Sequence, residues 1–155
     1  MNQMQEPMPR QTMGDQIAES NAESLADLSR YVEYVESSGN PKAVSPIGAA
    51  GLMGVMPGTA SQPGFGIDPM RPADLFDPAK NRAFGEQYLA AMLKRYKGNP
   101  EYAIAAYNWG PGNTDRWIRQ GANLAKLPTD TRDYIRGWRG QGKHKMPPNW
   151  KRHGE

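Results

Sequence analysis

The sequence lacks several residue types that support common kinds of functional site. It contains no cysteine among its 155 residues, which excludes disulfides, a thiolate nucleophile and cysteine-ligated metals. Its two histidines, His144 and His153, both lie near the C-terminal end and leave little for a histidine-based metal site. No apolar run approaches the roughly 18 residues of a membrane-spanning helix. We therefore expect no metal, no other cofactor and no transmembrane segment.

Glycine and proline, by contrast, are plentiful, with 17 and 14 copies, while hydrophobic residues make up 37% of the chain. The length fits one domain with short extensions. Met1 to Thr12 has no cationic segment followed by an apolar stretch, so no secretory signal peptide is predicted. We expect a domain over residues 15–140, preceded by a flexible arm over 1–14 and followed by a basic tail over 141–155.

Charge is unevenly distributed along the chain. Residues 1–36 contain seven acidic and two basic residues, a net charge of −5, whereas residues 132–155 contain seven basic and two acidic residues, a net charge of +5. A basic tail favours adhesion to an anionic wall or envelope surface, although solubility alone explains it equally well. We expect no nucleic-acid partner, because no nucleic-acid-binding motif accompanies the charge. The residues expected to contact such a surface are Lys143, Lys145, Lys151 and Arg152.

Apolar periodicity predicts a mainly helical domain with one irregular Gly/Pro-rich insert. The first helix is expected to start at a capping box formed by Ser20 and Glu23. Between the first and second helices, residues 39–78 form a Gly/Pro-rich insert of turns with room for a small β-hairpin. The five predicted helices begin and end near Ser20 and Gly39, Asp77 and Gly98, Asn99 and Asn108, Asn113 and Gly121, and Thr129 and Trp138.

Glu36 lies at the edge of the apolar stripe of the first predicted helix. At about 100° per residue from Leu25, the apolar side chains fall near 280–340° and Glu36 near 20°, whereas Glu33 falls near 80° and is expected to point toward solvent. A carboxyl held against apolar neighbours loses hydration, which raises its pKa and suits a general acid. Helix geometry alone favours the alternative, in which a glutamate in the last turn reaches out into water.

Three sequence blocks follow one another along the chain. The first is E-S-S-G-N-P-K-A-V-S-P-I-G-A-A-G-L-M-G-V-M-P-G-T-A over residues 36–60, the second is A-Y-N-W-G-P-G over 106–112, and the third is L-P-T-D-T-R-D-Y-I over 127–135. In order and spacing they resemble the soluble lytic transglycosylase catalytic domain of glycoside hydrolase family 23, which is related in fold to goose-type lysozyme. The resemblance covers residues 25–138, about three quarters of the chain, and implies an α+β lysozyme-like fold.

This resemblance implies cleavage of the β-1,4 bond between N-acetylmuramic acid and N-acetylglucosamine in the glycan strands of peptidoglycan. In the family one glutamate protonates the leaving oxygen, and the 6-hydroxyl of the muramoyl sugar completes the reaction as a 1,6-anhydro product. Glu36 matches that catalytic glutamate. Core packing is the alternative for each of the other matching positions. The positions that the resemblance assigns to substrate binding are Ser45, Met56, Tyr107, Asn108 and Tyr134.

Gly54 departs from the family pattern, which usually has glutamine there to hydrogen-bond the substrate. The missing side chain is expected to leave room for water. Three interpretations therefore stay open: a transglycosylase that forms anhydro products, a lysozyme-type hydrolase of the same bond, and a weakly active or non-catalytic peptidoglycan-binding or assembly protein. The absence of a signal peptide and lipid-anchor cysteine suits a monomeric bacteriophage endolysin or virion-associated lysin, present in the virion or the host cytoplasm and acting on the cell wall.

Overall fold

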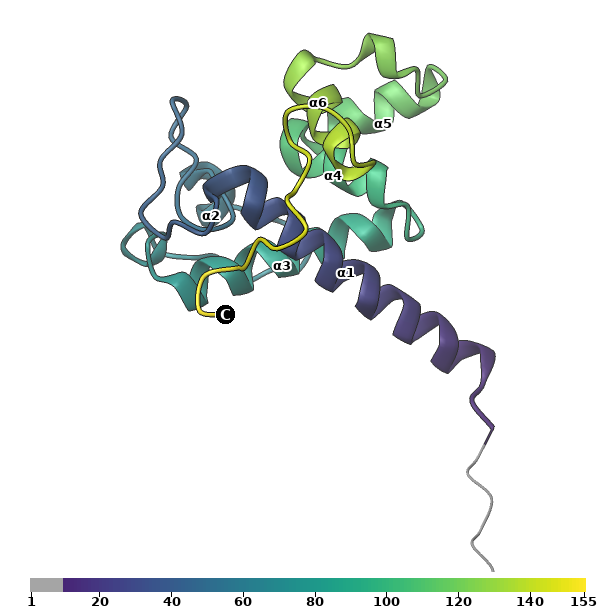
Figure 1. Cartoon of the computed structure of the whole chain (residues 1–155), viewed down its shortest axis with the longest axis horizontal. Helices are drawn as coiled ribbons and strands as arrows, with labels where there is room; N and C mark the ends of the chain where they lie inside the picture. Colours follow the sequence, from purple (N-terminus) through teal and green to yellow (C-terminus); the bar gives the residue numbers. More distant parts are fainter. Residues whose placement is uncertain (1–9) are drawn as a thin grey trace, which may run out of the picture.

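The computed structural model describes residues 10–155; residues 1–9, most of the predicted N-terminal arm, lie outside the described residues. The described chain forms six α-helices and two short 3-10 helices (Figure 1). In chain order they are α1 (Met13–Ser37), α2 (Pro57–Ser61), η1 (Pro72–Asp74), α3 (Pro78–Arg95), α4 (Pro100–Trp109), α5 (Pro111–Arg119), η2 (Leu124–Lys126) and α6 (Thr129–Trp138).

The mainly helical prediction is confirmed, and several helix ends follow from local capping chemistry. Asp77 and Asn99 accept hydrogen bonds from the first N–H groups of α3 and α4, and a proline follows each of them. The predicted bounds of α6 are those observed. Within residues 10–155 the insert contains no named strand. Two isolated antiparallel bridges, from Ala50 to Val44 and to Val55, stand where a small hairpin was expected.

The predicted start of the first helix was wrong. The helix begins at Met13, seven residues before Ser20, because Thr12 and Asp15 form a complete capping box of their own. The last two residues of the predicted arm therefore already belong to α1. Two potential caps lie on one helical segment here, and the sequence pattern does not say which one starts the helix.

The start of α5 was also predicted too late. The helix begins at Pro111, directly after Gly110, rather than at a cap formed by Asn113. The amide of Asn113 instead donates to the carbonyl of Trp109 at 3.0 Å. A proline in the first helical position has its φ already set for the helix, which explains the earlier start.

The core forms where α1, α3, α4 and α6 meet (Figure 1). The C-terminal half of α1 packs on α3 and α4, whereas its N-terminal half extends away from the body, with Met13 and Ile17 exposed. None of the helices in the described chain combines the length and apolar character needed to cross a membrane. The fully buried core side chains include Leu28 and Val32 of α1, Leu89 and Met92 of α3, Ile104 of α4 and Ile135 of α6.

The C-terminal segment, residues 141–155, returns from α6 across α1 to α3 (Figure 1). It covers the face of α1 on which Glu33 lies, so the prediction that Glu33 points toward solvent was wrong: its side chain is 0% exposed. Glu33 accepts hydrogen bonds from Arg82 at 2.8 Å, from Arg152 at 3.1 Å and from the backbone N–H of His153 at 3.0 Å. The helical angle failed as a guide because a distant segment covers that face.

Arg152 is consequently not a free surface cation. Its side chain is only 12% exposed and is shared among Glu33, Ser29 and Glu86. The expectation that Arg152 contacts an anionic surface was therefore wrong, since its charge is already paired inside the molecule. Lys143, 61% exposed, lies 3.6 Å from Asp133.

Candidate active site

Glu36 lies in the last turn of α1, which ends at Ser37; the next residue, Ser38, adopts a left-handed conformation. Its side chain is partly buried. The Oε1 atom accepts a hydrogen bond from the hydroxyl of Tyr134 on α6 at 3.2 Å. The Oε2 atom has no hydrogen-bond partner within residues 10–155 and is not sealed from solvent. One oxygen is thus fixed by the protein and the other remains available.

Burial raises the pKa of Glu36 to about 7, although the hydrogen bond from Tyr134 acts in the opposite direction. No lysine or arginine of the described chain forms a salt bridge with this carboxyl. Desolvation without a compensating cation therefore keeps the proton on Glu36 up to neutral pH. A carboxyl in this condition can act as a general acid and, after giving up its proton, as a base.

Two tyrosine hydroxyls lie close to the Glu36 carboxyl. Tyr134 is 2% exposed, and its ring packs edge-on against Tyr31, whose hydroxyl donates to the Tyr134 carbonyl at 2.7 Å. The hydroxyl of Tyr107, on α4, donates to the carbonyl of Met53 at 2.6 Å. Burial, and then the nearby charge of Glu36, raises the pKa of both Tyr107 and Tyr134, so both remain neutral donors.

Asn108 lies exposed at the end of α4, one residue after Tyr107. Its Oδ1 atom accepts a hydrogen bond from the hydroxyl of Thr131 at 2.7 Å, and Thr131 is buried at the start of α6. This bond fixes the amide plane and directs the NH₂ group away from Thr131. The sequence did not single out Thr131, although it stands within the third motif block.

The remaining two predicted site residues make no hydrogen bond to the carboxyl group. The Ser45 hydroxyl accepts the N–H of Ala49 at 3.0 Å and closes its own turn. Met56 is 37% exposed at the start of α2. Direct contacts thus bring Glu36 and Tyr134 together, whereas Ser45 stabilises the loop that follows α1.

A small pocket of about 50 Å³ borders Tyr107 and includes Met56 in its wall. Tyr88, on α3, was not among the predicted site residues. In the structure Tyr88 packs edge-on against Tyr107, with ring centroids 5.9 Å apart, and also against Phe65 at 6.0 Å. A tyrosine within an apolar stripe was the available signal. The pocket is lined by Gly54, Val55, Met56, Thr59, Phe84, Tyr88 and Tyr107.

The space beside Gly54 is not vacant on its Glu36 side. A Cβ atom at position 54 would stand 2.7 Å from the Cδ atom of Glu36, closer than non-bonded atoms pack. The glutamate carboxyl itself thus fills the place where a side chain would begin. The expectation that the missing side chain leaves room for water was wrong at this point.

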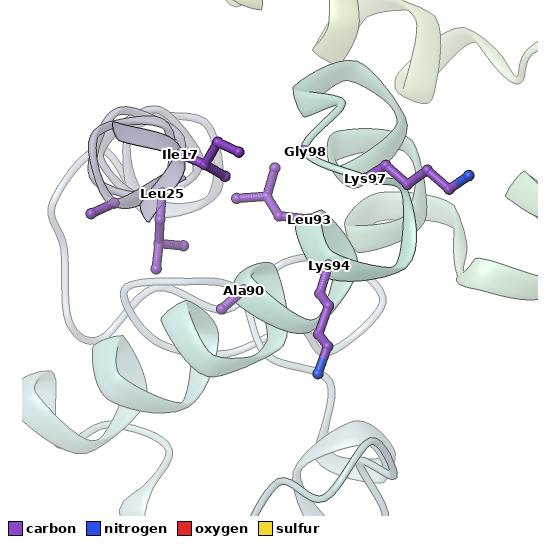
Figure 2. A pocket seen from close by; sticks show the side chains of 8 residues that line it. Ile17, Leu25, Ala90, Leu93, Lys94, Lys97 and Gly98 are labelled. Atoms are coloured by element: carbon purple, nitrogen blue, oxygen red, sulfur yellow. The ribbon is translucent and has the colours of Figure 1, made fainter. Parts of the chain in front are cut away.

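A second pocket, of about 580 Å³, lies between the N-terminal half of α1 and the end of α3. Figure 2 shows Ile17 and Leu25 opposite Leu93, with the ammonium groups of Lys94 and Lys97 pointing away. The described residues that line this pocket include no carboxyl and no tyrosine. In the described chain, moreover, no three His, Asp or Glu side chains gather where they could hold a metal ion.

The helical fold, with a tyrosine-bound carboxyl at the end of its long helix, places this domain in the lysozyme-like class. The sequence model described as the transglycosylase SLT domain matches residues 15–128, so the chain belongs to this family.

Several curated proteins are similar to this chain. The soluble lytic murein transglycosylase of Escherichia coli strain K12 is 34% identical over 142 residues, which cover 82% of this chain and 20% of that protein. The transglycosylase of Enterobacteria phage PRD1 is 36% identical over 118 residues, covering 76% of this chain and 39% of that protein. The chain therefore spans only about a fifth of the length of the Escherichia coli relative.

Solved structures agree with this family assignment. The crystal structure of the 70 kDa soluble lytic transglycosylase SLT70 from Escherichia coli matches with a TM-score of 0.58 and 28% identity, covering 93% of this chain and 27% of that one. A complex of the 70-kDa soluble lytic transglycosylase with bulgecin A matches with a TM-score of 0.61 and 28% identity, covering 92% of this chain and 27% of that one.

Proposed function

We propose that this domain is a lytic transglycosylase that cleaves the β-1,4 bond between N-acetylmuramic acid and N-acetylglucosamine in peptidoglycan. The observation that carries the proposal is the Glu36 carboxyl, which is desolvated, forms no salt bridge within residues 10–155 and is bound through one oxygen to Tyr134. Membership of the transglycosylase SLT domain family supports the choice of bond and substrate. A Pseudomonas aeruginosa relative, 26% identical, is inactive when one glutamate is replaced by glutamine.

In the proposed reaction Glu36 carries one proton through a closed cycle. The protonated carboxyl gives its proton to the glycosidic oxygen while the bond from that oxygen to the muramoyl C1 breaks. The carboxylate then takes the proton of the muramoyl 6-hydroxyl, whose oxygen forms a bond to C1. The products are a free N-acetylglucosamine 4-hydroxyl and a 1,6-anhydromuramoyl end, and Glu36 is protonated again without any water being consumed.

The surrounding side chains are assigned supporting roles. Tyr134 holds one oxygen of Glu36, which leaves the other to meet the glycosidic oxygen. The exposed amide of Asn108, oriented by Thr131, suits an acetamido or hydroxyl group of the sugar. Met56 and Tyr107 line the small pocket next to Gly54, which suits an apolar group such as an acetamido methyl. Ser45 is assigned a structural role in the loop that follows α1, where its hydroxyl accepts the N–H of Ala49.

Hydrolysis of the same bond is the alternative, and ordinary glycosidases use a second carboxylate for it. Three aspartates on α5 and α6 are the candidates for it, namely Asp115, Asp130 and Asp133, and two of them are engaged elsewhere. Asp115 is bound to the Tyr96 hydroxyl at 2.8 Å and to Arg95, and Asp133 lies 3.6 Å from Lys143. A single acid that alternates with a base therefore suits this site better than a carboxylate pair.

A bacteriophage lysin, either an endolysin or a virion-associated enzyme, is the biological role we propose. The similarity to the transglycosylase of phage PRD1 supports it. The substrate would then be the cell wall of the host bacterium.

The test compares wild type, Glu36→Gln and Glu19→Gln on permeabilised cells and purified peptidoglycan. Glu19 is exposed on the same helix and serves as the matched control. We expect loss of turbidity and anhydro-muropeptides by mass spectrometry from wild type and Glu19→Gln, with a rate roughly 10²–10⁴-fold lower for Glu36→Gln. Products with ordinary reducing ends would reject the transglycosylase and keep a hydrolase. Equal turbidity loss with Glu36→Gln would mean that this site is not catalytic.

A further inference from the structure

Gly54 lies directly against the Glu36 side chain, in the turn that follows the first bridge of the insert. Its φ of +60° is in the left-handed region, and its N–H donates to the carbonyl of Gly51 at 3.2 Å. A Cβ atom there would stand 2.7 Å from Cδ and 2.9 Å from Cβ of Glu36, and nearer still to Oε2. No other glycine in the described chain has Glu36 among its nearest neighbours.

This contact defines one side of the position in which the carboxyl rests. The Tyr134 hydroxyl holds Oε1 at 3.2 Å, while the bare backbone of Gly54 lies under Oε2. Because the Cβ of Glu36 is also too close, rotating the carboxyl would not by itself make room for a larger residue. Either α1 and the turn move apart or the glutamate leaves its place.

We propose that Gly54 is a positioning residue for Glu36. Because Gly54 has no side chain, the Glu36 carboxyl can stay bound to Tyr134 through Oε1 and present Oε2, the proton-carrying oxygen, to the sugar. The proposal rests on the catalytic role proposed above for Glu36. It gives the departure from the family pattern a function. Where the family usually has a glutamine, the Glu36 side chain of this chain lies against bare backbone.

The contact between Gly54 and Glu36 also shields the carboxyl from water. Backbone atoms of Gly54 cover part of Glu36 that would otherwise face water, and burial is the cause of its raised pKa. A side chain at position 54 would push the carboxyl outward, where hydration stabilises the charged form. The glutamate would then lose its proton at a lower pH and lose its hydrogen bond to Tyr134.

The test uses Gly54→Ala and a matched control, Gly64→Ala, in the full chain. Gly64 also has a positive φ, +68°, but a Cβ atom there meets nothing within 4 Å, so the control reproduces the backbone strain without the contact. The first readout is the pKa of the Glu36 carboxyl, from ¹³C NMR titration. The second is the initial rate of muropeptide release at limiting and saturating peptidoglycan across pH.

For Gly54→Ala we expect the Glu36 pKa to fall by about one unit or more. We expect the rate at saturating substrate to fall roughly 10- to 100-fold, with the half-saturating concentration nearly unchanged and the alkaline limb of the pH profile shifted to lower pH. Gly64→Ala should match wild type in both readouts. An unchanged Glu36 pKa and rate in Gly54→Ala would overturn the proposal.

A double variant covers the case in which Gly54→Ala does not fold. If the clash is with the Glu36 side chain, Glu36→Gly, which removes the Cβ as well, combined with Gly54→Ala should fold, and its urea midpoint should fall less relative to Glu36→Gly than Gly54→Ala falls relative to wild type. Failure of the double variant to fold, or equal losses, would contradict the proposal. If wild type releases no muropeptides, the proposed function fails, while the NMR titration still decides whether Gly54 positions Glu36.

Discussion

Two carboxyl groups three residues apart on α1 have opposite environments. Glu33 is completely buried but meets Arg82, Arg152 and the backbone N–H of His153. Burial alone would raise the pKa of Glu33, yet these hydrogen bonds and positive charges outweigh it and lower the pKa. Glu36 is less deeply buried, and within the described residues a tyrosine hydroxyl is the only hydrogen-bond partner of its carboxyl. Its pKa is raised to about 7.

The comparison teaches that the partners of a carboxyl, more than its depth, decide what it can do. A carboxylate locked between two guanidinium groups joins the C-terminal segment to α1 and α3, and it cannot serve as a proton donor at neutral pH. A carboxyl that is desolvated without a cation can exchange its proton, and it costs stability whenever it is charged. The first kind holds a fold together, and the second suits catalysis.

The largest effect on stability is expected from Glu33→Ala. Removal of this carboxylate leaves Arg82 and Arg152 facing each other in a largely buried place, so the free energy of unfolding should fall by about 3–5 kcal/mol at pH 7. Urea unfolding followed by circular dichroism measures the change. The control Glu19→Ala, on the exposed part of the same helix, should stay within about 0.5 kcal/mol of wild type.

The pH dependence gives that result a second check. Because the folded-state pKa of Glu33 is lowered, its contribution is present above the unfolded value of 4.5 and is lost as pH falls through the lowered pKa. The gap between wild type and Glu33→Ala should therefore narrow in acid. A gap that is constant from pH 7 to pH 3 would contradict the charge-based account of this buried cluster.

Glu36→Gln, unlike Glu33→Ala, should raise the free energy of unfolding above neutral pH. The folded-state pKa of Glu36 is raised from 4.5 to about 7, so the folded protein loses stability as pH rises through that window and gains it below. A neutral glutamine avoids this loss, so the variant should be more stable than wild type by up to about 3 kcal/mol at pH 8. The two proteins should unfold at nearly the same urea concentration at pH 4, and a variant less stable at pH 8 would refute the prediction.

Tyr134→Phe is expected to change the pKa of Glu36, and with it the pH dependence of activity, by a smaller amount. The hydroxyl lowers the pKa of Glu36 through its hydrogen bond, so its removal should raise that pKa by a fraction of a unit to about one unit. Wild-type activity should fall as pH rises through about 7, and the variant should lose activity at a correspondingly higher pH. Tyr107→Phe is the control, because its hydroxyl donates to Met53 rather than to Glu36. The pH–rate profiles of the three proteins measure this shift, and a Tyr134→Phe profile that coincides with that of wild type would contradict the prediction.

The smallest effect concerns the basic tail. Replacing Lys143, Lys145 and Lys151 together with alanine should weaken low-salt adhesion to anionic cell walls a few-fold, since each exposed ion pair contributes about 0.2–1 kcal/mol. The difference should disappear in high salt. Arg152→Ala should instead lower the stability of the fold, because Arg152 is bound to Glu33. Unchanged pelleting of the triple variant with cell walls at low salt would remove the adhesion role.

Much of the fold could be predicted because its signals are local. The caps at Asp77 and Asn99 and the span of α6 depend on a few adjacent residues, and the structure has them as predicted. The start of α1 could not be fixed in this way, because Thr12 and Ser20 both offer a capping pattern on one helical segment. Helical spacing placed Glu36 at the edge of the apolar stripe, and the structure has its side chain partly buried.

The sequence by itself determined the helices, the order of the motif blocks and the presence of an acid at the end of the first helix. Only the tertiary structure decided which carboxyl is paired and which is not. The cations around Glu33 come from positions 82 and 152, and the tyrosine that contacts Glu36 from position 134. Desolvation and charge pairing depend on which distant segments cover a helix face, and helical periodicity carries no information about those segments.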